Sequence, residues 1–130
     1  MAIRLLITED HPWVRRGLRA TFEDTEIEIA GEATTVEQAV RMALAGEADV
    51  MLLDLKLPDG DGFEILQKVK SEKSDLPVVI YSQYERSDFQ VRARNLGANG
   101  YLVKRADADE LIGAVRRVSQ GESLWCERVV

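Results

Sequence analysis

The chain has 130 residues and is 45% hydrophobic, which fits one folded domain and excludes a disordered chain. Its formal net charge of −6 argues against binding of nucleic acid by this domain itself, because phosphate backbones are held by basic patches. No apolar run approaches the roughly 20 residues needed to cross a membrane, and the single cysteine, Cys126, cannot form an internal disulfide, so a cytoplasmic location is expected.

The first strand and the first helix are predicted from the opening of the chain. Residues 3–8 form a short apolar run, as in a buried strand, and the run ends at Glu9 and Asp10. Pro12 follows, and proline is favourable in the first turn of a helix. Behind it, apolar side chains recur at every fourth position and mark one face of a helix: Val14, Leu18 and Phe22.

A second strand and a second helix follow. Residues 26–33 alternate apolar and polar side chains over part of their length, which predicts a strand. Thr35 and Gln38 have the spacing of a capping box, in which each side chain accepts from the other residue's backbone N–H. The helix is predicted from one apolar stripe: Val36, Val40, Ala43 and Leu44. Gly46 is a plausible residue for its end.

The third strand and the loop behind it carry the strongest local signals. The continuous apolar run at residues 50–53 suits a central parallel strand that is covered on both faces, and it ends at Asp54. Residues 57–62, with the sequence Leu-Pro-Asp-Gly-Asp-Gly, are the strongest turn signal in the chain. A third helix is predicted behind this turn from its apolar stripe: Phe63, Leu66 and Val69.

The rest of the chain predicts two more strands and two more helices. Residues 76–81 and residues 100–103 are expected to be the fourth and fifth strands, and the fifth ends at Lys104. Between them, residues 87–96 predict a helix with few apolar positions. Asp107 is a favourable N-cap for the last helix. That helix is predicted from a further apolar stripe: Leu111, Val115 and Val118.

Five strands that alternate with five helices indicate an α/β fold, with a parallel sheet between two layers of helices. In such folds, sites form beyond the carboxyl ends of the strands. Four of the predicted strands are followed there by polar residues that can take part in chemistry: Glu9 and Asp10, Asp54, Ser82 and Lys104. If the sheet is parallel, we expect these side chains to meet at one edge of it.

The chemistry of this set points to phosphoryl transfer. Carboxylates held a few ångströms apart repel one another, and Mg²⁺ relieves that repulsion because it prefers oxygen ligands. Lys104 supplies further positive charge, and the Ser82 hydroxyl can donate to a phosphoryl oxygen. Phosphoryl transfer mainly requires in-line positioning and neutralised charge. We therefore interpret Asp54 as a nucleophile that forms an acyl phosphate.

Each of these residues also has an ordinary structural interpretation. An acidic residue behind a strand is commonly a helix cap or a solvated loop residue, and a lysine is commonly a surface residue. His11, the only histidine, is interpreted as a surface residue, because sites for hard cations favour oxygen ligands. Trp125 is either a core residue or part of a contact. What favours the functional interpretation is that the polar residues occur together, each at the end of a predicted strand.

These residues are where the sequence resembles a known family, the receiver domains of bacterial two-component response regulators. The resemblance covers essentially residues 1–130, which we interpret as a single receiver domain. It depends on four motifs in combination: Glu9-Asp10, residues 52–62, residues 78–82 and residues 100–104. The resemblance implies a doubly wound, flavodoxin-like sheet of five parallel strands in the order 2-1-3-4-5, with five flanking helices.

The resemblance also implies a role for each matching residue at the metal site. Asp54 accepts a phosphoryl group from a phosphohistidine of a sensor histidine kinase. Asp10 and Asp54 bind Mg²⁺ directly, the backbone carbonyl of Lys56 is a further ligand, and Glu9 acts largely through water. The domain promotes its own phosphotransfer and dephosphorylation, and it is a signalling domain rather than an enzyme.

A conformational switch is implied as well. Lys104 and Ser82 contact the phosphoryl oxygens, and Tyr101 turns inward when Ser82 moves toward them. That change is expected at the face formed by the fourth helix, the fifth strand and the fifth helix. A phosphorylation-dependent homodimer through the face near Tyr101 is a further hypothesis from the resemblance.

The two ends of the chain resemble one subfamily, in which a LuxR-type helix-turn-helix domain follows the receiver. The matching segments are residues 9–18 and 111–122. A DNA-binding output domain that regulates transcription would then follow residue 130, and none is present in this chain. The chain is either a receiver cut from a longer protein, which we favour, or a stand-alone receiver.

Two other functions remain open from the sequence alone. In the first, the domain is an interaction module that works without phosphorylation, and its acidic residues are relics. In the second, the fold carries an enzyme or a flavin site. A phosphohydrolase with an aspartyl nucleophile would want a second carboxylate at the position of Lys56, and Glu9 and Asp10 would repel a flavin phosphate in the absence of a metal.

Overall fold

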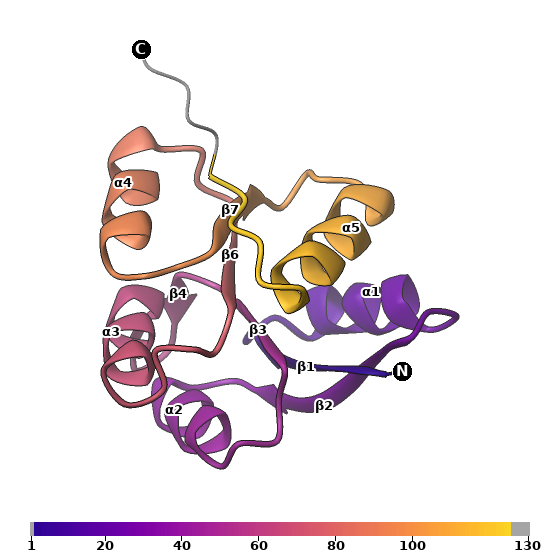
Figure 1. Cartoon of the computed structure of the whole chain (residues 1–130), viewed down its shortest axis with the longest axis horizontal. Helices are drawn as coiled ribbons and strands as arrows, with labels where there is room; N and C mark the ends of the chain where they lie inside the picture. Colours follow the sequence, from indigo (N-terminus) through magenta and orange to yellow (C-terminus); the bar gives the residue numbers. More distant parts are fainter. Residues whose placement is uncertain (1, 126–130) are drawn as a thin grey trace.

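The apolar runs of the sequence form one parallel sheet in the computed structural model, which describes residues 2–125 (Figure 1). The strand order is β2-β1-β3-β6-β7, which confirms the predicted order 2-1-3-4-5 when the strands of this sheet are counted alone. Its strands are β1 (Ile3–Thr8), β2 (Ile27–Ala33), β3 (Val50–Leu53), β6 (Val78–Ser82) and β7 (Gly100–Val103). The helices between them are α1 (Pro12–Phe22), α2 (Val36–Leu44), α3 (Gly62–Glu72), α4 (Ser87–Asn95) and α5 (Ala108–Ser119).

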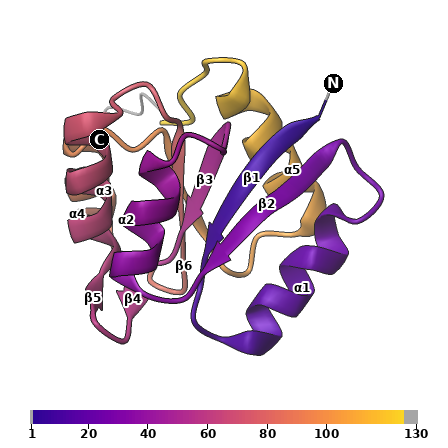
Figure 2. The same cartoon turned by 90° about the horizontal axis from the view of Figure 1, so that it is seen from below.

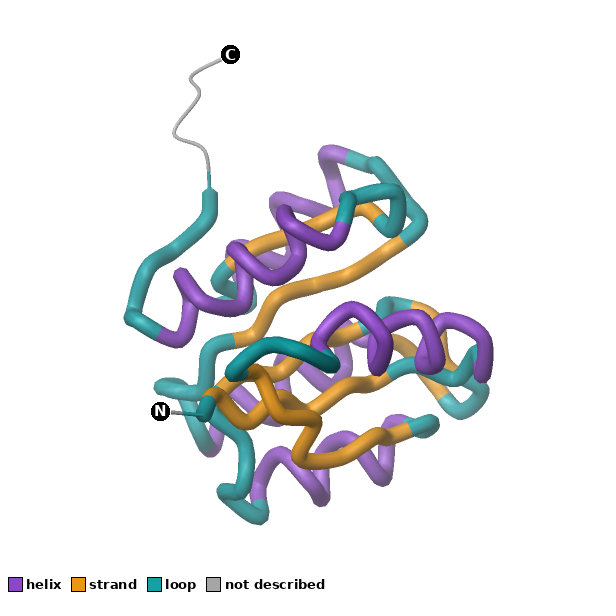
Figure 3. The backbone as a smooth tube through the Cα atoms, turned by 90° about the vertical axis from the view of Figure 1, so that its right-hand side faces the viewer, coloured by secondary structure: helices purple, strands orange, loops and turns teal. Residues whose placement is uncertain are grey.

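Helices cover both faces of the sheet, α1 and α5 on one and α2, α3 and α4 on the other (Figures 1 and 3). The central strand β3 is apolar and buried throughout, because successive side chains point to opposite faces and both faces are covered. In β1, Leu5 and Ile7 pack under α1 and α5, while Leu6 packs under the other three helices. The polar strand ends are therefore brought to one edge by a sheet that is buried on both sides.

The predicted caps are present, with one difference. Asp107 caps α5 through the backbone N–H of Glu110, at 2.8 Å, and Gly46 has a positive φ of 80° where α2 ends. Thr35 accepts from the backbone N–H of Gln38, as in a capping box, but the Gln38 side chain accepts from the backbone N–H of Thr34. The second half of the box is thus shifted by one residue.

The predicted turn at residues 57–62 contains a small antiparallel hairpin, β4 (Lys56–Leu57) and β5 (Gly60–Asp61). Figure 2 shows this hairpin at the end of the molecule where β1 runs into α1. The Asp59 carboxylate accepts from the first backbone N–H of α2, that of Val36, at 2.7 Å. The loop behind β3 is thereby fastened to a neighbouring helix.

Helix α4 is weakly packed, as the sequence predicted. Ala93 is its one buried residue, and an arginine lies over an aromatic ring at its N-cap and another in its last turn. The Arg86 guanidinium is 4.2 Å from the Phe89 ring centroid, and Arg92 is 4.3 Å from that of Phe63. Cation–π contacts of this kind are weak at exposed sites. The helix therefore depends on surface contacts more than on a buried stripe.

The Trp125 indole donates a hydrogen bond to the carbonyl of Ala98, at 2.7 Å, and packs against the core, which supports its interpretation as a core residue. Cys126 lies outside the described residues. Within residues 2–125, no helix combines the length and the apolar character that crossing a membrane requires.

Candidate functional site

Backbone hydrogen bonds extend the sheet beyond its strands and fix the residues that follow them. The Asp54 N–H donates to the Thr8 carbonyl, at 3.1 Å, and the Lys104 N–H donates to the Ser82 carbonyl, at 2.8 Å. Similarly, Glu9 is held by a bond from its N–H to the carbonyl at the end of β2. The parallel strands thus end at one edge, as the sequence predicted.

Three of the predicted residues form one charged group at this edge. Glu9 is 1% exposed and Asp54 is 5% exposed. The Lys104 ammonium is 2.6 Å from a carboxylate oxygen of Glu9 and 3.3 Å from one of Asp54. The other oxygen of Asp54 accepts from the backbone N–H of Leu55, at 2.8 Å. Lys104 is therefore closer to Glu9 than to the predicted phosphoacceptor.

The two buried carboxylates differ in acidity. The pKa of Asp54 is raised from its usual 3.8 to about 6: burial is the largest cause, the charge of Glu9 adds to it, and Lys104 offsets only part of the two effects. Burial also acts to raise the pKa of Glu9, but hydrogen bonds from Lys104 and His11 outweigh it and leave that pKa below 4.5. Lys104 consequently stabilises the ionised form of Glu9 more than the ionised form of Asp54.

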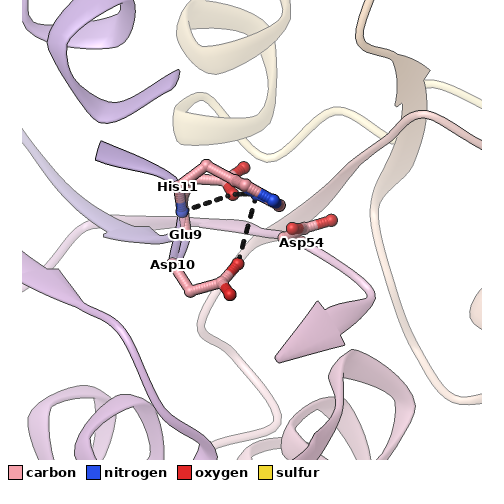
Figure 4. A group of neighbouring side chains, drawn as sticks. All are labelled: Glu9, Asp10, His11 and Asp54. Atoms are coloured by element: carbon pink, nitrogen blue, oxygen red, sulfur yellow. Dashed lines mark hydrogen bonds and ion pairs between the residues drawn. The ribbon is translucent and has the colours of Figure 1, made fainter. Parts of the chain in front are cut away.

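Asp10 and His11 complete the group shown in Figure 4. Asp10 Oδ1 is buried and accepts no hydrogen bond. It lies 3.3 Å from His11 Nδ1, which is within ion-pair distance for a protonated imidazole but lacks hydrogen-bond geometry. A buried acceptor without a donor is costly, and three carboxylates face a single lysine. These residues therefore fit a hard divalent cation, which would supply the missing positive charge.

Glu9, Asp10, His11 and Asp54 each offer one ligand atom, and these atoms lie within 4.8 Å of one another. The sequence predicted three of the four and interpreted His11 as a surface residue. The position of His11 directly after Glu9 and Asp10 was the one feature of the sequence that indicated a place near these carboxylates. The imidazole folds back over the two carboxylates, so the interpretation of a surface role was incomplete.

The remaining predicted residues lie around this group. The Ser82 hydroxyl is fully buried and accepts from the backbone N–H of Tyr84, at 3.0 Å. The half-buried Tyr101 lies inward, and its hydroxyl donates to the carbonyl of Tyr84. The exposed Lys56 begins the hairpin, with its ammonium 5.8 Å from the centroid of the Tyr84 ring. The Tyr84 backbone thus joins Ser82 to Tyr101.

Gly62 fixes the loop beneath Asp54, and we expect Gly62→Ala to destabilise the fold. A Cβ at this position would collide with the backbone carbonyl oxygen of Asp54. We expect a loss of about 2 kcal/mol in the free energy of unfolding, measured by urea denaturation. Gly113→Ala is the control, because a Cβ there meets no atom within 4 Å and alanine favours a helix interior by up to about 1 kcal/mol. Equal stability of the two variants would contradict the close approach.

A doubly wound sheet that gathers three carboxylates and a lysine at its carboxyl edge defines a class of signal-receiving α/β domains. The chain belongs to the response regulator receiver domain family, whose model matches residues 5–116. It is 37% identical over 127 residues to the DNA-binding transcriptional activator DevR/DosR of Mycobacterium tuberculosis. The aligned region covers 97% of this chain and 58% of that protein. It is also 36% identical over 121 residues to the transcriptional regulatory protein LiaR of Bacillus subtilis, over 92% of this chain and 57% of that protein.

The solved structures agree with this assignment. A two-component response regulator of the LuxR family from Aurantimonas sp. SI85-9A1 superposes with a TM-score of 0.89 at 27% identity, covering 95% of this chain and 89% of that one. The chain spans just over half the length of the curated relatives that it matches. It is therefore similar to the receiver part of LuxR-type response regulators and is a phosphorylation-based signal receiver by family.

Proposed function

We propose that Asp54 accepts a phosphoryl group from a phosphohistidine of a sensor histidine kinase. The observation that carries the proposal is the buried Asp54 carboxylate, held by the Leu55 N–H on one oxygen and by Lys104 on the other. In the reaction, a carboxylate oxygen forms a bond to phosphorus while the phosphorus–nitrogen bond breaks. The electron pair of that bond leaves with the imidazole.

We assign the binding of Mg²⁺ to the carboxylates of Asp10 and Asp54 and the backbone carbonyl of Lys56, with Glu9 acting through water. When bound, Mg²⁺ neutralises charge on the transferring phosphoryl group. The carboxylates of this group already lie together and carry more negative charge than Lys104 balances. Lys104 would hold a phosphoryl oxygen once Glu9 has a second cation near it.

Ser82 and Tyr101 form the switch in this proposal. The Ser82 hydroxyl bonds to the N–H of Tyr84, and the carbonyl of the same residue bonds to Tyr101. If the Ser82 hydroxyl turns to a phosphoryl oxygen, the Tyr84 N–H loses its partner and the loop before α4 rearranges. Since α4 has a single buried residue, it can follow that change at low cost.

The partners of the switch follow from the similarity to LuxR-type regulators. We propose that the chain is the receiver domain of a longer transcription regulator, whose DNA-binding output domain responds to the face around Tyr101. The receiver itself would bind no nucleic acid, consistent with its charge of −6. A homodimer that forms on phosphorylation through the same face is part of this proposal.

Intact-mass spectrometry after incubation with acetyl phosphate and Mg²⁺ tests the central step. We expect one phosphoryl adduct on the wild type, none on Asp54→Asn, and none on the wild type in EDTA. The matched control is Asp61→Asn, which changes an exposed acid whose role is to cap α3 through the N–H of Glu64 and should keep the adduct. An adduct that persists on Asp54→Asn would refute the assignment of the phosphoacceptor. No adduct on any sample would favour the interaction module.

A further inference from the structure

His11 lies beside the carboxylates of the proposed metal site, although the proposed Mg²⁺ chemistry makes no use of it. Its Nδ1 atom is 3.0 Å from a carboxylate oxygen of Glu9 and 3.3 Å from one of Asp10. Figure 4 shows the ring lying over these carboxylates, with Asp54 beside them. The imidazole nitrogen thus faces the same space as the carboxylates.

The His11 side chain does not stabilise the start of helix α1. His11 is the N-cap residue of α1, but its side chain makes no capping hydrogen bond, and Pro12 occupies the first helical position. The imidazole packs against the Trp13 ring, with centroids 4.9 Å apart, and Trp13 itself is 68% exposed. The contacts that hold the ring in place are therefore those with Glu9 and Asp10.

The distances also suit a single shared ion. Ligand atoms bound to one divalent metal at 2.0–2.2 Å are separated by at most about 4.4 Å. The nitrogen of His11 and the oxygens of Glu9, Asp10 and Asp54 lie within 4.8 Å of one another. The separations of His11 Nδ1 from the carboxylate oxygens of Glu9 and Asp10, 3.0 Å and 3.3 Å, lie within that limit.

We propose that His11 is a nitrogen ligand of this site, so that the site takes first-row transition-metal ions more tightly than Mg²⁺. Imidazole is a poor ligand for Mg²⁺ and a good one for Ni²⁺, and the affinity of a site that contains it rises in the order Mn²⁺, Co²⁺, Ni²⁺. The inference rests on the proposed function, because it concerns the identity of the cation in the same acidic site. It adds a specificity residue that the oxygen ligands alone do not provide.

Isothermal titration calorimetry with Ni²⁺ and with Mg²⁺ tests the assignment. Every sample carries Cys126→Ser, which removes the only thiol of the chain, and the purification tag is cleaved. We expect His11→Leu to weaken Ni²⁺ binding by about tenfold or more and Mg²⁺ binding by less than about threefold. The matched variant His11→Asn offers an oxygen in place of the nitrogen, and it should lose Ni²⁺ affinity while it keeps Mg²⁺ affinity.

A spectroscopic readout is independent of affinity. Electron spin echo spectra of bound Mn²⁺ should contain nitrogen modulation from an imidazole, which His11→Leu abolishes; His11 is the only histidine of the chain. Equal loss of Ni²⁺ and Mg²⁺ affinity in His11→Leu, unchanged Ni²⁺ affinity, or no imidazole signal would overturn the inference. A wild type that binds neither ion would overturn the proposed metal site as well, so the two failures can be told apart.

Discussion

Lys104→Met is expected to lower the free energy of unfolding by about 3–5 kcal/mol at neutral pH in EDTA. The substitution keeps much of the volume of the side chain but removes the cation that lies 2.6 Å from Glu9 and 3.3 Å from Asp54. It leaves two buried carboxylates facing each other without a counter-charge, and each raises the pKa of the other. Urea denaturation monitored by circular dichroism measures the loss.

The physical cause can be separated from a general packing defect. Glu9→Gln in the Lys104→Met background should recover part of the lost stability, because the second substitution removes one of the repelling charges. Mg²⁺ should also stabilise Lys104→Met by binding the folded state. Arg105→Met is the control, since its ion pair with Glu85 is fully exposed and should change stability little. A loss for Lys104→Met that neither Glu9→Gln nor Mg²⁺ reduces would point to packing instead of charge.

The fold was predictable because its signals are local and repeated. Buried strands such as β3 read as continuous apolar runs, and the acidic or glycine residues that end and cap the helices occupy fixed offsets from the apolar stripes. Boundaries were less certain: residues 76–81 were predicted as the fourth strand, whereas β6 spans Val78–Ser82. The short hairpin behind β3 was predicted only as a turn, because two paired residues in each strand leave no alternation to detect.

The sequence predicted which residues form the site better than it predicted the contacts between them. That Glu9, Asp54 and Lys104 meet follows from parallel strands that end at one edge. That Lys104 is closer to Glu9 than to Asp54 depends on side-chain conformations that no sequence pattern specifies. The contacts of His11 with Glu9 and Asp10 could not be predicted for the same reason, because the direction of its ring decides whether it faces solvent or the carboxylates. The roles of Lys56, Ser82 and Tyr101 remain predictions that the proposed experiments address.

Asp54→Asn is expected to stabilise the fold in the absence of metal, by about 1–3 kcal/mol at pH 8. A carboxyl whose pKa is raised from 3.8 to about 6 binds its proton more tightly in the folded state than in the unfolded state. The wild type therefore loses stability as the pH rises from about 4 to about 6. Asparagine has no such proton to lose, and its oxygen can still accept from the Leu55 N–H.

The gain should accordingly depend on both pH and metal. In EDTA the gain should be near zero only below about pH 3, where Asp54 is protonated in both the folded and the unfolded state, and it should reach its full value above about pH 7. Saturating Mg²⁺ should narrow it, because the ion stabilises the wild type more than the variant. Asp59→Asn is the control: hydrogen bonding from the Val36 N–H lowers the pKa of that exposed carboxyl, so its substitution should bring no gain. If Asp54→Asn is no more stable than the wild type at pH 8 in EDTA, burial and the charge of Glu9 do not destabilise the ionised Asp54 carboxylate. Repulsion between these carboxylates would then not be what favours a cation at this edge of the sheet.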